Sequence, residues 1–197
     1  MTTKTKEDRL EEVGKSSLSC LRDMVAALEC DYDRLEELRE ERDDLYAEWK
    51  QARDDEDAAL NGAPDADYDN AKTLPAKADA LEEWDAENLA DMRDLINAAG
   101  ECKSREDAID RIMEDPLSIQ FRGGWHDRDS ESEDEEFMIL LTTGGPAVRI
   151  IGEFGQGRSI HRVYLQVQDW GTPWTDYYEE NISDVLEAYC HCLGLDC

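Results

Sequence analysis

The chain has 197 residues and carries 50 Asp and Glu against 21 Lys and Arg, which gives a formal net charge of −29 at pH 7. This excess of acid excludes direct binding to nucleic acid or to anionic membranes, because both would repel the chain. A length near 200 residues permits one domain or two small ones, and a content of 40% hydrophobic residues argues against wholesale disorder.

No run of apolar residues reaches the length of a membrane span, and the N-terminal residues lack the apolar core of a secretion signal. We therefore expect a cytoplasmic protein whose six cysteines are reduced thiols. Four soft ligands near the C-terminus offer a zinc alternative, but their spacing is unlike that of structural zinc sites, so thiols at a helix end are favoured. They are Cys190, His191, Cys192 and Cys197. The acidic segments lack the glycine of an EF-hand, and we predict no metal site and no cofactor.

Two long helices are predicted in the first half of the chain, after residues 1–15, which are polar and expected to be flexible. From Ser16 to about Leu60, apolar residues recur at steps of three and four, which indicates one helix with a narrow apolar stripe. A second helix opens at Leu74-Pro75 and ends at Gly100. We predict that residues 16–100 form a long, acidic, antiparallel helical hairpin. The facing residues would be Leu21, Leu28 and Leu35 on one helix and Leu81, Leu89 and Met92 on the other.

Residues 104–197 are predicted to form a small α+β domain. A short helix from Ser104 ends at Pro116 and leads into a first strand, Leu117–Phe121. Three further β-rich segments separated by short Gly-containing turns predict an antiparallel meander, namely 137–142, 147–154 and 163–170. A last helix from about Ser183 would cover one face of this sheet. The predicted fold class is therefore α+β, a long helical hairpin followed by an antiparallel sheet of three to four strands packed by a C-terminal helix.

Two segments of the sheet region carry a family resemblance. They read TGGPAVRIIGE at residues 143–153 and QDWGTPWT at residues 168–175, and they resemble small, mostly uncharacterised proteins encoded by phages and prophages. The resemblance covers the last third of the chain and names no reaction. It implies a mobile-element origin and residence in the cytoplasm of a host cell. Small acidic proteins that disarm host defences, of the anti-CRISPR and anti-restriction type, are a recurring class among such elements.

Acidic residues gather in two segments that we predict to bind a partner. The first lies on the first helix and consists of Asp43, Asp44, Asp54, Asp55, Glu56 and Asp57. The second lies between Trp125 and Phe137 and consists of Asp127, Asp129, Glu131, Glu133, Asp134, Glu135 and Glu136. A solvated loop is the alternative interpretation of the second segment. The net charge of the chain nevertheless exceeds the magnitude of roughly 2 to 8 that a small domain needs for solubility. This excess favours a functional acidic surface.

No recognisable arrangement of nucleophile, acid and base, and no phosphate-binding loop that opens a helix, occurs in the sequence, so we predict that the protein is not an enzyme. We expect an inhibitor that binds stoichiometrically to a basic nucleic-acid-binding protein, such as a CRISPR effector or a restriction enzyme, and offers carboxylates where that protein expects phosphates. The alternative is a structural or scaffolding protein of a phage. In that case the hairpin would serve for oligomerisation, because a heptad-like stripe can also dimerise.

We place Trp170 and Trp174, which flank the last turn, at the seam between the sheet and the C-terminal helix. A large aromatic side chain of this kind is more often buried than exposed. An exposed aromatic that anchors a partner is the alternative.

Overall fold

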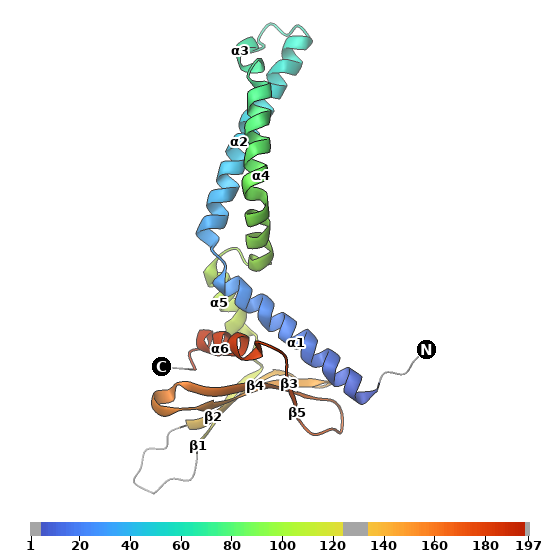
Figure 1. Ribbon diagram of the computed structural model, residues 1–197, viewed down its shortest axis with the longest axis vertical. Helices are drawn as coiled ribbons and strands as arrows, with labels where there is room; N and C mark the ends of the chain where they lie inside the picture. The colour runs from blue at the N-terminus through green and yellow to red at the C-terminus, as the bar shows by residue number, and fades with distance from the viewer. Residues whose placement is uncertain (1–4, 124–133, 196–197) are drawn as a thin grey trace. The chain divides into compact units, whose positions relative to one another are not determined.

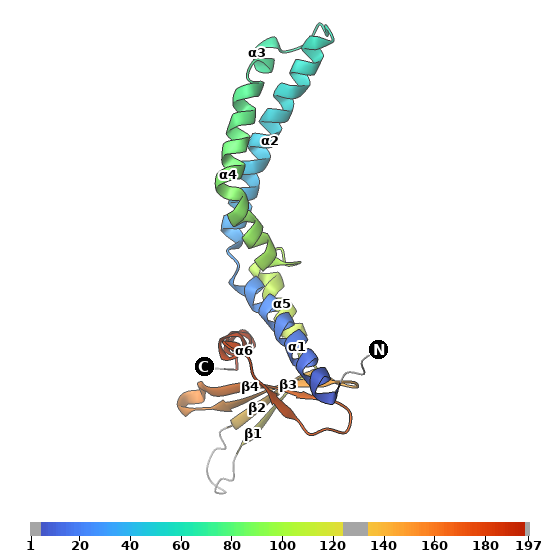
Figure 2. The ribbon, with the colours of Figure 1, turned by 45° about the vertical axis from the view of Figure 1, so that its right-hand side comes forward.

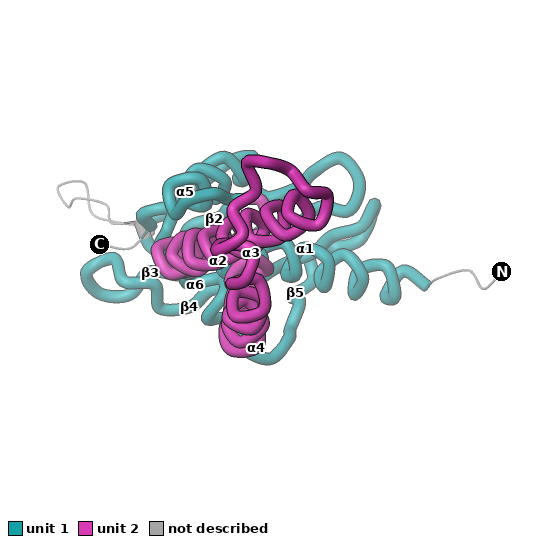
Figure 3. Tube along the Cα trace, turned by 90° about the horizontal axis from the view of Figure 1, so that it is seen from above, with its two compact units in different colours: residues 1–29, 102–197 teal, residues 30–101 magenta. Residues whose placement is uncertain are grey.

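The computed structural model describes residues 5–123 and 134–195 (Figure 1). The chain divides into two compact units, shown in separate colours in Figure 3. The sheet unit comprises Met1–Glu29 and Cys102–Cys197, and the hairpin unit comprises Cys30–Glu101. The hairpin unit is thus an insertion between two parts of the sheet unit.

The sheet unit contains a five-stranded antiparallel sheet in the order β1-β2-β3-β4-β5, which confirms the predicted α+β class and the meander. The strands are β1 (Ser118–Gly123), β2 (Asp134–Thr142), β3 (Ala147–Phe154), β4 (Ile160–Gln168) and β5 (Thr175–Tyr177). The sheet has five strands, and three to four were predicted. Strand β5 was not predicted, because its three residues are too few to show an alternating pattern. A short 3₁₀ turn, η1 (Gln156–Arg158), lies between β3 and β4.

Helices cover one face of this sheet. They are α1 (Lys6–Glu29) and α6 (Ile182–Cys192), with α5 (Arg105–Glu114) packed beside them (Figures 1 and 2). The strands alternate as predicted, since Val163, Leu165 and Val167 are buried while the residues between them are not. The apolar core therefore lies between one sheet face and the two helices.

The largest error of the sequence-based prediction concerns helix α1. Residues 16–29 were assigned to the hairpin, yet Leu18 and Leu21 are at most 1% exposed and belong to the core of the sheet unit. Helix α1 also begins at Lys6, within the segment expected to be flexible. The break falls at Asp31, whose side chain accepts a hydrogen bond from the Arg34 backbone N–H and caps a new helix. Because Leu28, Tyr32 and Leu35 keep the three-and-four spacing across this break, periodicity alone could not locate it.

The hairpin unit is built from α2 (Tyr32–Leu60) and α4 (Leu74–Ala99), joined by the short helix α3 (Tyr68–Ala71). Its interior is thin, because only a few small or aliphatic side chains are buried and most of the stripe stays half-buried. The buried side chains are Leu35, Leu38, Ala52 and Ala99. Of the predicted leucine pairs, only the α2 and α4 members lie in this unit, while Leu21 and Leu28 pack in the sheet unit.

Within the described residues, no helix combines the length and the apolar character that crossing a bilayer demands.

Candidate functional site

The hairpin unit concentrates the negative charge of the protein. Its 72 residues contain 24 acidic and 8 basic side chains, so its net charge is 8 − 24 = −16. Helix α2 has 29 residues and spans about 43 Å at a rise of 1.5 Å per residue. Spread along that length, the hairpin carries one net negative charge per about 2.7 Å, which lies between the roughly 3.4 Å of one DNA strand and the 1.7 Å of a duplex.

The predicted acidic residues of α2 are displayed along the hairpin and do not converge on a single point. Asp43, Asp44, Asp54, Glu56 and Asp57 are all exposed. None of the ion pairs within 4.0 Å among the described residues involves any of these five side chains. Their charge is therefore available to a partner.

Asp55 differs from its neighbours because it has a structural role. Its Oδ2 accepts hydrogen bonds from Asn70 Nδ2 at 2.6 Å and from Gln51 Nε2 at 3.2 Å. These bonds, the one from Asn70 first, hold the pKa of Asp55 below its ordinary value. Asp55 thus fixes the segment around α3 against α2, and it is removed from the set of free carboxylates.

Polar contacts between α2 and α4 fix the positions from which the acidic side chains project. Arg42 Nε donates to Asp85 Oδ1 at 2.9 Å, and Trp84 Nε1 donates to Glu41 Oε2 at 3.1 Å. Arg34 lies 3.8 Å from Asp91 further along the same pair of helices. Each exposed pair contributes little to stability, but together they fix the rotation of one helix about the other.

Most of the second predicted acidic segment lies outside the described residues. This part contains Asp127, Asp129, Glu131 and Glu133. The strand that follows was predicted to begin at residue 137, and this was wrong, because β2 begins at Asp134 and continues through Glu135 and Glu136. Glu136 accepts a hydrogen bond from the guanidinium of Arg122 on the neighbouring strand. Glu136 is therefore a cross-strand ion-pair partner.

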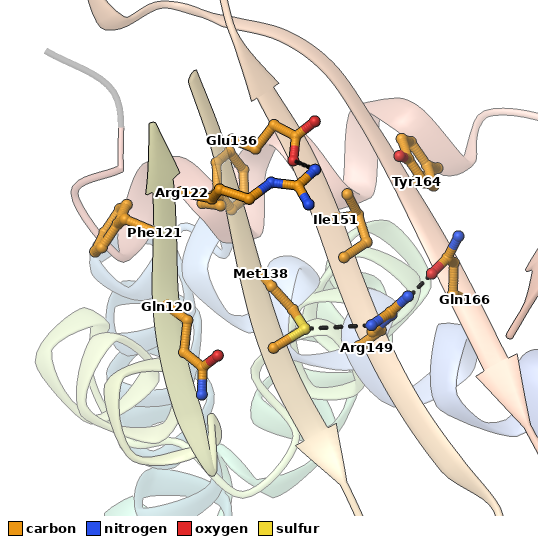
Figure 4. Close-up of a pocket in the computed structure, with 10 residues that line it drawn as sticks. Gln120, Phe121, Arg122, Glu136, Met138, Arg149, Ile151, Tyr164 and Gln166 are labelled. Carbon is orange, nitrogen blue, oxygen red and sulfur yellow. Dashed lines mark hydrogen bonds and ion pairs between the residues drawn. The ribbon is translucent and has the colours of Figure 1, made fainter. Parts of the chain in front are cut away.

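Sequence reasoning missed a hollow of about 340 Å³ on the open face of the sheet, the face opposite α1 and α6 (Figure 4). Its floor is formed by Met138, Ile151 and Tyr164, which are paired neighbours on β2, β3 and β4. Arg149 and Gln166 line one side and Arg122 with Glu136 another. These residues come from the four successive strands β1 to β4, and the strand register decides which of them meet.

Arg149 is the most constrained side chain in this hollow. Its Nε donates to Gln166 Oε1 at 2.8 Å and its Nη1 contacts Met138 Sδ at 3.4 Å (Figure 4). Its guanidinium also lies 4.1 Å from the ring centroid of Trp174. Burial lowers the pKa of the Arg149 guanidinium, and the neighbouring Tyr164 opposes that change. Burial, and after it the charge of Glu153, raises the pKa of Tyr164.

The two tryptophans do not lie at the predicted seam. Trp174 packs on Arg149, which points from the open face, and Trp170 is 74% exposed. The loop that carries Trp170 is held by hydrogen bonds from Asp169 N to Thr172 Oγ1 at 3.0 Å and from Thr172 N to the Asp169 carbonyl at 3.0 Å. Trp170 is therefore exposed, and its role as an anchor for a partner stays a prediction.

Cys190 and Cys192 do not form a metal centre with other described residues. Cys190 is fully buried in the core and Cys192 is half-buried, as the opposite faces of one helix require. Burial raises the pKa of the Cys192 thiol. Across residues 5–123 and 134–195, no group of three or more His, Cys, Asp or Glu has the geometry to hold a metal ion, and Cys197 lies outside this range.

Comparison of the chain with protein-family models, with curated proteins and with solved structures gave no match.

Proposed function

We propose that this protein is a binding protein whose acidic hairpin unit occupies the nucleic-acid-binding surface of a basic partner protein. The observation that carries the proposal is the linear charge density of the hairpin, one net negative charge per about 2.7 Å of helix. A surface of Lys and Arg built for phosphates at 1.7 to 3.4 Å spacing releases a similar number of counterions when it meets this array.

The rigidity of the display supports the same function. Carboxylates on a helix are already fixed in position, so binding loses less conformational entropy than it would with a flexible acidic segment. The contacts of Arg42 with Asp85 and of Trp84 with Glu41 keep α2 and α4 in one arrangement. The self-repulsion of this charge destabilises the hairpin, which suggests that the charge serves binding.

The class of partner follows from the charge and from the phage resemblance. We propose a nucleic-acid-binding component of a host defence system, such as a CRISPR effector or a restriction enzyme. The protein would then act without catalysis, at a one-to-one ratio with its target, and it would compete with DNA or RNA for a single basic groove.

The direct test is competition. A pull-down from host extract with the full chain is expected to retain a basic protein, and added duplex DNA is expected to displace it. Binding should weaken by at least tenfold between 50 and 200 mM salt, because several counterions are released together. Retention that survives both DNA and salt would refute charge mimicry.

A pair of variants with equal changes in charge locates the surface. The first variant neutralises Asp43, Asp44, Asp54 and Glu56 to Asn or Gln. The control neutralises four exposed acidic residues on helices of the sheet unit, Asp23, Glu29, Asp110 and Glu114. Only the first variant is expected to lose affinity, whereas equal losses would mean that total charge, and not the hairpin, drives binding.

A second candidate function is oligomerisation through the hairpin. It is favoured by the thin interior, since Ala99 is the one buried side chain of α4 and Ile96 is 39% exposed. A second copy would cover this half-buried stripe. Light scattering coupled to size exclusion distinguishes the two functions, because the mimic is expected to be monomeric and the oligomer is not.

A further inference from the structure

The open face of the sheet differs in charge from the rest of the protein. In a chain of net charge −29, the hollow on this face is lined by two arginines, Arg122 and Arg149, and by a single carboxylate, Glu136. Glu136 is already paired with Arg122. Arg149 is therefore left without an ion-pair partner among the residues that line the hollow, and the charge of Asp176 acts on it only from further away.

The environment of Arg149 contrasts with that of the other arginines on the same face. Arg122 pairs with Glu136, and Arg162 lies 3.9 Å from Glu153. No carboxylate of the described residues lies within 4.0 Å of the Arg149 guanidinium. A half-buried cation in a strongly acidic protein would be expected to acquire such a partner.

The guanidinium is nevertheless held in place by uncharged groups. Gln166 accepts from Arg149 Nε and in turn donates from Nε2 to Asp176 Oδ1 at 2.7 Å, and Asp176 accepts from the Tyr178 hydroxyl at 3.0 Å. Trp174 packs against the guanidinium, with 4.1 Å between Arg149 Cζ and the ring centroid. Nη2 makes no hydrogen bond to the described residues, and Nη1 contacts only the weak acceptor Met138 Sδ. The donor edge of the fork is thus fixed in orientation, and no oxygen or nitrogen of the described residues accepts from it.

We infer that this hollow is a binding site for a small carboxylate ligand with an apolar body. The carboxylate would take the Nη1 and Nη2 edge of Arg149, which matches its planar, two-oxygen geometry. The apolar body would lie on Met138, Ile151 and the ring of Tyr164, which form the floor. A volume of about 340 Å³ falls within the range of pockets for small molecules.

The site is independent of the proposed role of the hairpin, because every residue that forms it belongs to the sheet unit. Its test does not require the macromolecular partner. We choose 2-naphthoate as the probe and its neutral twin 2-naphthamide as the control, since the two share the apolar body and differ in charge.

The experiment is an NMR titration of the ¹⁵N-labelled full chain. Naphthoate is expected to shift the amides of residues around the hollow, including Met138, Ile151 and Gln166, and to saturate, while naphthamide binds at least tenfold more weakly. Arg149→Gln is expected to weaken naphthoate binding by about tenfold or more, and Arg149→Lys is expected to recover only part of it because the fork is lost. Arg162→Gln removes a cation of the same face outside the hollow and should leave the affinity within twofold.

Three results would overturn the site. These are an absence of saturable naphthoate shifts in the wild-type chain, equal affinities for naphthoate and naphthamide, or equal losses in Arg149→Gln and Arg162→Gln. The comparison of the two probes is made on the wild-type chain, so it stands even if a variant fails to fold.

Discussion

Gly14 shows how a single missing side chain permits a helix to reach the sheet. It is buried on α1, and a Cβ at this position would overlap the ring of Tyr177 on β5. Tyr177 is 5% exposed and donates from its hydroxyl to Glu179 Oε2 at 2.9 Å, and burial raises the pKa of Tyr177 to about 12. Glu179 also accepts from Arg22 Nη1 at 2.6 Å. The ring therefore has little room to move away from α1.

We predict that Gly14→Ala destabilises the protein although alanine is the better helix former. The steric overlap costs about 1–3 kcal/mol, which exceeds the gain of about 1 kcal/mol from helix propensity. Ser16→Ala on the exposed side of α1 serves as the matched control and should leave stability unchanged or slightly raised. Thermal unfolding followed by circular dichroism measures both variants, and a melting temperature of Gly14→Ala above that of wild type would contradict the packing.

Individual residues were predictable from the sequence where a local pattern decides their place. Alternation along β4 placed Val163, Leu165 and Val167 in the core. The environment of Arg149 was not predictable, because it depends on Gln166 and Trp174, and only the register of three strands brings these together. Trp170 was misplaced because hydrophobic character does not reveal that a hydrogen-bonded loop holds a ring in solvent.

Helix α1 is the element whose packing partner differs most from the sequence-based prediction. Its stripe was expected to face α4 within the hairpin, but Leu18, Leu21, Met24 and Val25 pack on the sheet. An amphipathic stripe indicates that a helix buries one face, but it does not indicate which element covers that face. Strands β1 to β4 and helices α4, α5 and α6 followed from local signals, whereas the partner of α1 depends on residues more than a hundred positions away.

We predict that charges introduced into the apolar stripes of α1 and α2 unfold different units of the protein. Leu21→Asp is expected to unfold the sheet unit, because losing a buried leucine costs about 2–5 kcal/mol and an unpaired buried carboxylate adds to that cost. Leu38→Asp, which alters a side chain that is 0% exposed, is expected to unfold the hairpin unit instead. In NMR spectra the first variant should lose the dispersed strand amides and the second should retain them. The same loss in both variants would mean that the units fold as one.

Charge acts on the molecule as a whole. The hairpin unit carries −16 in 72 residues, so the remaining 125 residues carry −29 + 16 = −13. Repulsion between exposed carboxylates weakens as salt shortens the Debye length from about 30 Å at 0.01 M to about 8 Å at 0.15 M. Salt is therefore expected to relieve repulsion within this protein and to weaken its attraction to the proposed basic partner.

We predict that salt has opposite effects on stability and on partner binding. Raising NaCl from 10 to 150 mM is expected to raise the melting temperature, and to raise it most for the transition of the hairpin unit, where the charge is denser. The Asp43, Asp44, Asp54 and Glu56 variant should show a smaller increase than the matched control. Melting curves that are independent of salt would indicate that the carboxylates are neutralised by bound cations.

The insertion of the hairpin unit between α1 and the rest of the sheet unit also has a consequence during synthesis. Helix α1 ends at residue 29, but β4, on which it packs, is complete only at residue 168. At about 5–20 residues per second, a ribosome needs roughly 7–28 s to make the intervening chain. For that time the nascent helix exposes Leu18, Leu21 and Met24 with no sheet to cover them, while the hairpin, whose contacts are local, can already fold. The acidic hairpin that follows would then keep neighbouring nascent chains apart, so the same charge would protect the protein during its synthesis.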